Sequence, residues 1–229
     1  MWSRRVGDAG IIALSLKIAI VATLISAPPA LAVAWLLARG RFWGRSILNA
    51  AVHLPLVLPP VVTGYVLLRV LGRRGVVGAF LEEHLGVVFA FRWTGAAIAA
   101  AVMGFPLMVR AIRLAIESVD RDLEDAAGTL GASPWWTFVT ITLPLAFPGV
   151  LAGLILGFAK ALGEFGATIT FVSNIPGETQ TLALAIFTLI ETPGTDAAVM
   201  RLVGVSVAVS FAALMVSEYL ARRVTRGRR

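Results

Sequence analysis

Five long apolar segments constrain this chain more than any other feature of its sequence. A helix needs about 20 mostly apolar residues to cross a bilayer, and each segment is of roughly that length. Overall, 58% of the residues are hydrophobic and only 14% are charged, whereas soluble domains carry about 25% charged residues. We therefore expect an all-α integral membrane protein, a single domain over residues 1–229, with spans at about 11–37, 47–71, 95–115, 145–162 and 202–220.

The first apolar run, Ile11 to Leu37, follows Arg4 and Arg5 and is too long for the apolar core of a cleavable signal peptide. We expect it to be retained as a transmembrane helix. Prolines interrupt the first three spans, and each proline frees a backbone carbonyl and kinks a helix. Such kinks are common in membrane helices and do not by themselves indicate a function. The prolines are Pro28, Pro29, Pro55, Pro59, Pro60 and Pro106.

Basic residues lie at the ends of the apolar segments and give the chain a net charge of +7. They form no stripe interleaved with aromatic side chains, so we expect no nucleic-acid partner. With five spans and the C-terminus inside, the inner segments hold eleven arginines and the outer ones six, which follows the positive-inside rule, although the C-terminal tail creates most of this bias. The inner arginines are Arg39, Arg41, Arg45, Arg110, Arg113, Arg121, Arg222, Arg223, Arg226, Arg228 and Arg229.

Residues 163–200 contain two apolar runs that are too short to cross a bilayer, Phe165–Val172 and Thr181–Ile190. Proline–glycine pairs follow both runs and mark turns. Because both neighbouring spans open to the outer side in this topology, we expect an outer-facing or re-entrant gate segment with one short helix, Thr181–Ile190. Re-entrant backbone persists in a membrane only where protein buries it or where it lines water. A simple outer loop is the alternative.

A polar interlude, residues 117–144, lies between the third and fourth spans. Apolar residues recur there at helical spacing, which predicts a short helix over Asp120–Leu130. Carboxylates crowd its first turns, where the helix dipole stabilises negative charge. Gly131 is expected to end this helix, because glycine adopts the left-handed conformation without strain. The apolar positions are Leu123, Ala126, Ala127 and Leu130.

A second helix is predicted directly after the glycine, with Ser133 as its N-cap, Pro134 at its first position and Pro144 at its end. The result is a rigid helix–turn–helix hairpin that projects from the membrane. Its alanine pair lets a partner backbone approach and its tryptophans supply apolar anchors, which suits docking into a groove. An amphipathic helix lying in the interface is the alternative. It is disfavoured because the first helix is acidic and the chain reverses direction.

The residues of this hairpin resemble the EAA loop of ABC-importer permeases, which docks on the ATPase subunit. The matching pattern is Asp125-Ala126-Ala127, then Gly131 after three residues, Ile141 after nine more, and Leu143-Pro144. The chain departs from the pattern in one residue, since Asp125 stands where glutamate is usual. The resemblance implies the type I ABC-importer permease fold, and contact with the ATPase through Asp125, Ala126, Ala127 and Gly131.

Three further stretches, beginning at His53, Phe105 and Gly163, resemble the permeases of molybdate ABC importers, and the resemblance extends from about Leu14 to Ala221. It implies a subunit that translocates molybdate across the inner membrane. Tungstate is nearly isosteric with molybdate, and sulfate permeases are similar in outline, so both remain alternatives. The implied partners are two ABC ATPase subunits, a periplasmic oxyanion-binding protein and a second copy of the chain.

Neutral donors gather beside the glycine-rich break in the gate segment. A dianion that crosses a bilayer needs hydrogen-bond donors along its path but no site that binds it tightly. We therefore predict that these donors line a translocation path or gate. The alternative is that they only satisfy backbone groups at a local turn. Glu164 lies one turn after Lys160, and the two charges are expected to neutralise each other. A glutamate on the path would repel an anion, so we interpret Glu164 as holding the gate segment. The donors are Thr168, Thr170, Ser173 and Asn174.

The chain has no cysteine, and its only histidines are His53 and His84, so we expect no metal site and no cofactor. His53 is expected to be satisfied locally rather than to bind a ligand. The sequence lacks a Walker A motif, an HExxH motif and a serine–histidine pairing. We therefore expect a non-enzymatic subunit. A proton-coupled secondary anion transporter with Glu164 as its relay is a more distant alternative, and it would leave the hairpin unexplained.

Overall fold

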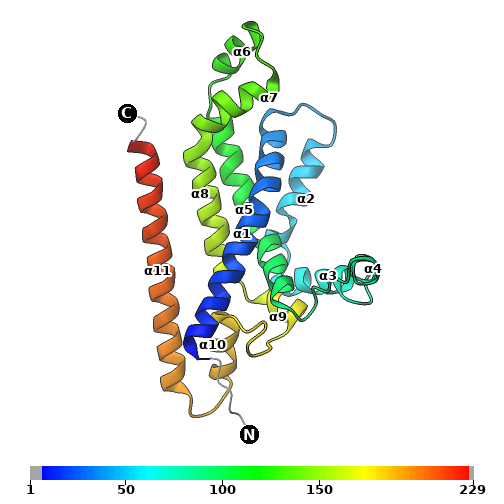
Figure 1. The fold of residues 1–229 in the computed structure, drawn as a ribbon, viewed down its shortest axis with the longest axis vertical. Helices are drawn as coiled ribbons and strands as arrows, with labels where there is room; N and C mark the ends of the chain where they lie inside the picture. Colours follow the sequence, from blue (N-terminus) through cyan, green and yellow to red (C-terminus); the bar gives the residue numbers. More distant parts are fainter. Residues whose placement is uncertain (1–6, 227–229) are drawn as a thin grey trace.

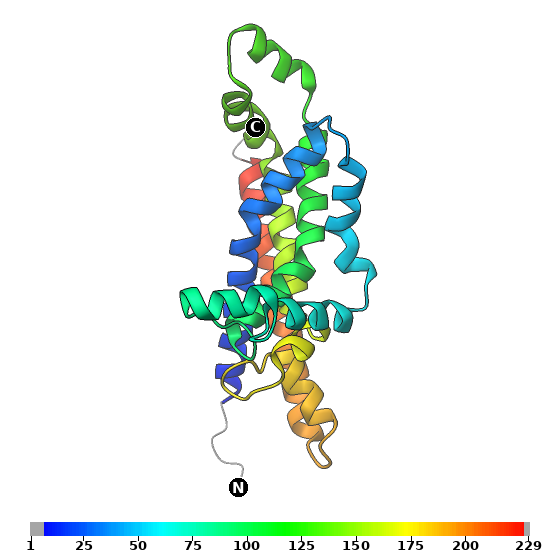
Figure 2. The same cartoon turned by 90° about the vertical axis from the view of Figure 1, so that its right-hand side faces the viewer.

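The computed structural model describes residues 7–226, so the arginines at positions 4, 5, 228 and 229 lie outside the described residues. Within that range every regular element is helical, and long helices run side by side with a short-helix hairpin at one end (Figures 1 and 2). In chain order the elements are α1 (Asp8–Arg39), α2 (Arg45–Val57), α3 (Pro60–Leu71), α4 (Val76–Leu85), α5 (Trp93–Glu117), α6 (Arg121–Thr129), α7 (Pro134–Thr137), η1 (Phe138–Thr142), α8 (Leu143–Leu162), α9 (Gly166–Val172), α10 (Leu182–Ile190) and α11 (Asp196–Arg226).

Four helical stretches of the described chain are long and apolar enough to cross a membrane. Three of them contain the spans predicted at 11–37, 95–115 and 145–162, and the fourth overlaps the span predicted at 202–220 up to Val216. The count becomes five if the pair α2 and α3 is taken as one broken span. The long stretches are Asp8–Arg39, Trp93–Glu117, Pro134–Leu162 and Asp196–Val216.

The span predicted at 47–71, which the sequence expects to be interrupted by prolines, is broken in the structure into α2 and α3, which meet at an angle of 112°. The break falls at Leu58 and Pro59, which both have extended backbone. Each of these residues precedes a proline, and the ring of a following proline disfavours helical backbone. Pro60 then begins α3 at a position that requires no backbone donor. By contrast, α1 continues without interruption through Pro28 and Pro29.

Small residues hold the long helices together. The contact faces of α1 and α5 are rich in buried alanine, including Ala19, Ala22, Ala97 and Ala100. A β-carbon added to Gly104 of α5 would lie 3.0 Å from a carbonyl oxygen of α8. Small side chains allow such close approach, which is how helices associate where lipid is as apolar as the core.

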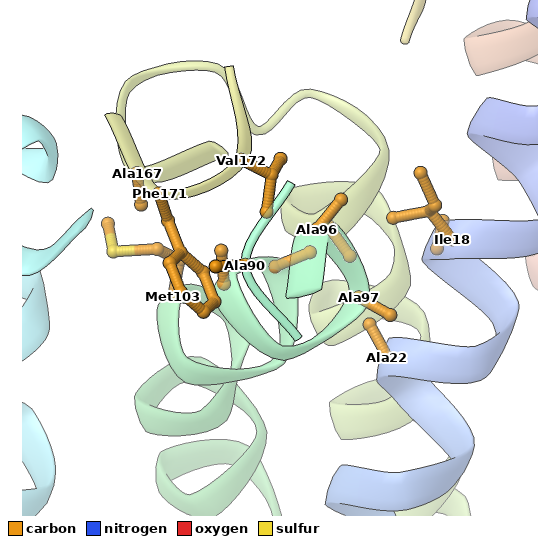
Figure 3. Close-up of a cluster of buried hydrophobic side chains, with 13 residues drawn as sticks. Ile18, Ala22, Ala90, Ala96, Ala97, Met103, Ala167, Phe171 and Val172 are labelled. Carbon is orange, nitrogen blue, oxygen red and sulfur yellow. The ribbon is translucent and has the colours of Figure 1, made fainter. Parts of the chain in front are cut away.

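The end of the bundle opposite the hairpin contains two short helices, α9 and α10, where the sequence predicted only Thr181–Ile190. Helix α10 begins after Thr181 and ends at Ile190, as predicted. The additional helix α9 packs against α3 and α5, and its residues Phe171 and Val172 are fully buried beside Met103 and Ala96 (Figure 3). Seven residues give too few turns for a helical period to be recognised in the sequence.

Candidate functional site

The first helix of the hairpin, α6, has the two ends that the sequence predicted. The Asp120 carboxylate accepts a hydrogen bond from the backbone N–H of Asp122 at 3.0 Å and caps its start. At its end the Ala132 N–H donates to the Ala127 carbonyl at 3.0 Å, and Gly131 has a φ of +89°. This is the glycine-stopped pattern of a helix C-terminus. A β-carbon on Gly131 would meet no atom within 4 Å, so the backbone conformation alone requires glycine.

The second helix of the hairpin begins as predicted but does not end as predicted. The Ser133 hydroxyl accepts a hydrogen bond from the Trp136 N–H at 3.3 Å. From α7 the chain continues without a break through the π-helical turn η1 into α8, so the expectation that Pro144 ends this helix is wrong. In η1 the Leu143 N–H bonds to the Phe138 carbonyl, five residues back. In this wider turn the backbone leaves the regular α-helical register, in which a proline ring clashes with the carbonyl four residues back.

The tip of the hairpin exposes apolar side chains. Helix α6 contains no buried residue, and the predicted contact residues Asp125 and Ala126 are exposed while Ala127 is half-buried. Leu130 is 89% exposed and Trp135 is 70% exposed. Within the described chain, these side chains therefore leave an apolar surface uncovered at the point where the sequence predicts a docking contact.

The base of the hairpin is held by a charged cluster that sequence reasoning missed. The Arg39 Nε lies 3.0 Å from the Glu124 Oε2, and the Arg39 Nη2 donates to the Glu124 Oε1 at 3.0 Å. The same Nη2 donates to the carbonyls of Ile116 and Val119 at 2.9 and 3.0 Å. The Thr142 hydroxyl donates to the Glu124 Oε1 at 2.6 Å. We call Arg39, Glu124 and Thr142 the hairpin clamp.

The clamp lies beside a cleft of about 560 Å³ under the hairpin. Trp35 of α1 and Phe138 of η1 line it, and their rings meet edge to face with centroids 5.7 Å apart. The Arg39 and Glu124 side chains are only 13% and 18% exposed. Charges that are this little exposed to solvent are screened less by salt than a surface pair.

No local signal in the sequence identifies the clamp. Arg39 and Glu124 are separated by 85 positions, and Arg39 reads as one of several arginines at the end of a span. Glu124 belongs to an acidic run whose members look alike in sequence. Only the fold brings the two together.

Glu164 lies at the other end of the bundle and is 2% exposed. Its Oε2 accepts a hydrogen bond from the Lys160 ammonium at 2.7 Å, which agrees with the predicted neutralisation. Its Oε1 accepts from the Ala167 N–H at 3.0 Å, in the first turn of α9. The carboxylate therefore caps α9 while it pairs with a lysine of α8.

Two of the four predicted donors of the gate segment already donate hydrogen bonds within that segment. The Thr170 hydroxyl donates to the Gly166 carbonyl at 2.9 Å, and the Asn174 amide donates to the Thr188 hydroxyl at 2.6 Å. Thr168 is buried, whereas Ser173 is exposed and has a φ of +62°. The hydroxyl of Thr170 thus satisfies a backbone carbonyl of its own helix, which is the alternative role given for these residues. A path lined by these residues stays a prediction.

His53 is satisfied within its own helix, as the sequence suggested. Its Nδ1 lies 2.8 Å from the Asn49 carbonyl oxygen, one turn earlier.

The helical bundle and its projecting hairpin define a class of membrane transport subunit. The chain belongs to the family described as binding-protein-dependent transport system inner membrane component, whose model matches residues 30–226. It is therefore a multi-pass protein of the inner membrane. Solved structures similar in fold include a bacterial ABC transporter that imports the acidic polysaccharide alginate (TM-score 0.75, 20% identity, 95% of this chain and 79% of that chain) and the MetNI methionine ABC transporter (TM-score 0.68, 15% identity, 95% and 94%). The predicted type I ABC-importer permease fold is confirmed.

The curated relatives of the chain carry names that include a transported substance. The chain is 57% identical over 209 residues to the molybdenum transport system permease protein ModB of Escherichia coli strain K12, covering 91% of each chain. It is 56% identical over 211 residues to ModB of Haemophilus influenzae, covering 92% of each. A probable sulfate transport system permease protein, cysT of Chlorokybus atmophyticus, is 37% identical over 177 residues, which is 77% of this chain and 62% of that protein.

Proposed function

We propose that this chain is the membrane-spanning permease subunit of an ATP-driven importer of molybdate. A separate ATPase powers it, and a periplasmic binding protein delivers the oxyanion. The observation that carries the cargo assignment is the 57% identity to a molybdenum permease over 91% of both chains. The sulfate relative is less similar, at 37%. Tungstate, as a near isostere, is expected to share the path.

The ATPase docks on the hairpin through Asp125, Ala126, Ala127 and Gly131. The exposed apolar side chains at the hairpin tip support this assignment, because a partner that covers them gains hydrophobic contact. Asp125 keeps the carboxylate of the family pattern on a shorter side chain. Two copies of the chain, each holding one ATPase, would enclose a path on a two-fold axis.

The hairpin end of the bundle faces the cytoplasm. The C-terminal end of α11 points to the same end as α6 and α7, while α9 and α10 lie toward the opposite end (Figure 1). A cytoplasmic ATPase must reach the hairpin, so residues 117–144 and the C-terminus lie inside and residues 163–200 lie outside. The binding protein then approaches the outer end.

The gate segment acts near the outer end of the path. Glu164 holds α9 through its cap and its ion pair, which supports a structural role at the gate. Thr168, Thr170, Ser173 and Asn174 are the candidates for lining the path. Thr168 and Ser173 are the two whose hydroxyls have no described local use.

Reconstitution tests the proposal. The complex of this chain with its ATPase is placed in liposomes with the binding protein outside, and molybdate, tungstate and sulfate are supplied in turn. We expect ATP hydrolysis to rise with molybdate and tungstate, and uptake to require ATP on the ATPase side. Uptake driven by a proton gradient without ATP would overturn the class of transporter. Stimulation of ATP hydrolysis by sulfate, but not by molybdate or tungstate, would overturn the assignment of molybdate as the cargo.

A further inference from the structure

The hairpin has little apolar packing that fixes α6 to the rest of the chain. Helix α6 buries none of its residues and packs chiefly on α7 and η1. Those two elements are better held, since Thr137 and Phe138 are each 7% exposed. An element without a core of its own keeps its position through specific polar contacts or loses it to thermal motion.

Arg39 provides the first half of such a contact. It is the last residue of α1, and its Nη2 donates to the carbonyl of Ile116 in the last turn of α5 and to that of Val119 just beyond the end of α5. One guanidinium thus joins the ends of two long helices, because carbonyls at a helix C-terminus have no partner within the helix.

Glu124 provides the second half. Its two oxygens meet the fork of Arg39 at 3.0 Å each, and such a two-point pair fixes direction as well as distance. The Thr142 hydroxyl donates to the same carboxylate at 2.6 Å, from the π turn that leads directly into α8. Glu124 is also the neighbour of Asp125 in the proposed docking surface.

We propose that Arg39, Glu124 and Thr142 are positioning residues that transmit movement of the docked hairpin into α1, α5 and α8. The inference rests on the proposed function and goes beyond it, since the docking surface itself lies at the exposed tip. When an ATPase moves the tip, a clamped α6 carries the three helix ends with it. An unclamped α6 docks as before, but the movement is absorbed at the loops, so ATP is hydrolysed with little import.

The test measures how many molybdate ions enter per ATP hydrolysed, in liposomes that contain the complete complex and binding protein. Glu124→Gln, Arg39→Gln and the double variant are compared with the unchanged chain. We expect each to lower the ratio by roughly 2- to 30-fold, while the ATPase still co-purifies in normal amount. The double variant should fall no further than the lower single variant, because residues that act as one unit are not additive.

Arg39→Gln leaves a mostly buried carboxylate unpaired and can prevent folding. The double variant, which carries no such charge, and Thr142→Val keep the test valid in that case. Asp122→Asn is the matched control, because it removes an exposed carboxylate from the same helix that makes no ion pair among the described residues.

The outcomes separate the two proposals. If the unchanged chain imports without ATP, the proposed function fails. If the unchanged chain couples import to ATP and the clamp variants do so equally well, the clamp inference alone fails. Loss of the ATPase from purified Glu124→Gln complex would also overturn the inference, since the residue would then serve docking rather than transmission.

Discussion

The hairpin and the gate segment are both built from short helices, yet they are stabilised in opposite ways. In the gate segment, α9 buries Phe171 and Val172 completely between its neighbours. In the hairpin, α6 buries nothing and Trp135 remains 70% exposed. A segment with its own core keeps one shape, whereas uncovered apolar side chains favour association. Helix α9 is therefore a fixed part of the chain, whereas the hairpin is the part that, in the proposed function, a partner covers.

The largest expected difference between the two regions lies in the effect of truncating one aromatic residue in each, Phe171 in the gate segment and Trp135 in the hairpin. Phe171→Ala should lower the free energy of unfolding by about 3–5 kcal/mol, because it opens a cavity in a packed core. Trp135→Ala should change it by less than about 0.5 kcal/mol, as expected for an exposed site. It should instead weaken ATPase binding by about 2 kcal/mol, as truncation of an interface anchor does. Thermal melting in detergent and ATPase titration measure the two effects, and equal melting temperatures would contradict the comparison.

A glycine gives the next largest effect. A β-carbon on Gly64 of α3 would lie 2.5 Å from the Ala167 carbonyl oxygen and 2.9 Å from the Ala167 Cα. Backbone atoms of a packed helix cannot move aside cheaply, so Gly64→Ala should cost about 1–3 kcal/mol of stability. Gly204→Ala is the control, because nothing lies within 4 Å of its added carbon. A melting temperature unchanged by Gly64→Ala would show that α3 and α9 are not held at this distance.

The turn of the hairpin tests the docking half of the comparison. With φ at +89°, Gly131→Val should strain the turn by about 1–2 kcal/mol and abolish ATPase docking while membrane insertion stays intact. Gly131→Asn should keep docking, because asparagine tolerates the left-handed conformation. Co-purification of the ATPase with the valine variant would argue against the coupling role of this turn.

The smallest effect is expected at Glu164. Glu164→Gln keeps an oxygen for the Ala167 N–H and loses only the charge that faces Lys160, a side chain that is 30% exposed. We expect a loss of about 1 kcal/mol in stability and continued ATP-driven uptake. Glu164→Ala removes the cap of α9 as well and should cost up to about 2 kcal/mol. Abolished uptake in the glutamine variant at normal stability would favour a proton relay instead.

Features encoded over a few neighbouring residues could be predicted from the sequence. Gly131 and Ser133 mark the ends of the two hairpin helices, since caps depend on positions within one turn. Lys160 and Glu164 meet because they are four residues apart on one helix. Four of the five spans follow from apolar length alone.

Features that depend on distant parts of the chain could not be predicted. The pair of Arg39 and Glu124 exists only because the bundle brings α1 and α6 together. The helix continues past Pro144 directly after a π turn, and such a turn leaves no recognisable pattern in composition. The proline pair that breaks the second span resembles the pair that α1 passes through, so residue type alone does not distinguish them.

The π turn η1 also sets how far the hairpin is rotated about the axis of α8. Its extra residue lies between Ser133 and Leu143, within helical structure that continues into α8. Each α-helical residue rotates the chain by about 100° about the helix axis. One residue more or less in η1 therefore changes the direction in which Trp135 and Trp136 face. Deleting a single residue from Phe138–Thr142 would therefore rotate the hairpin relative to α8 by about 100°. The number of residues in η1 thus determines the direction in which the hairpin faces relative to α8.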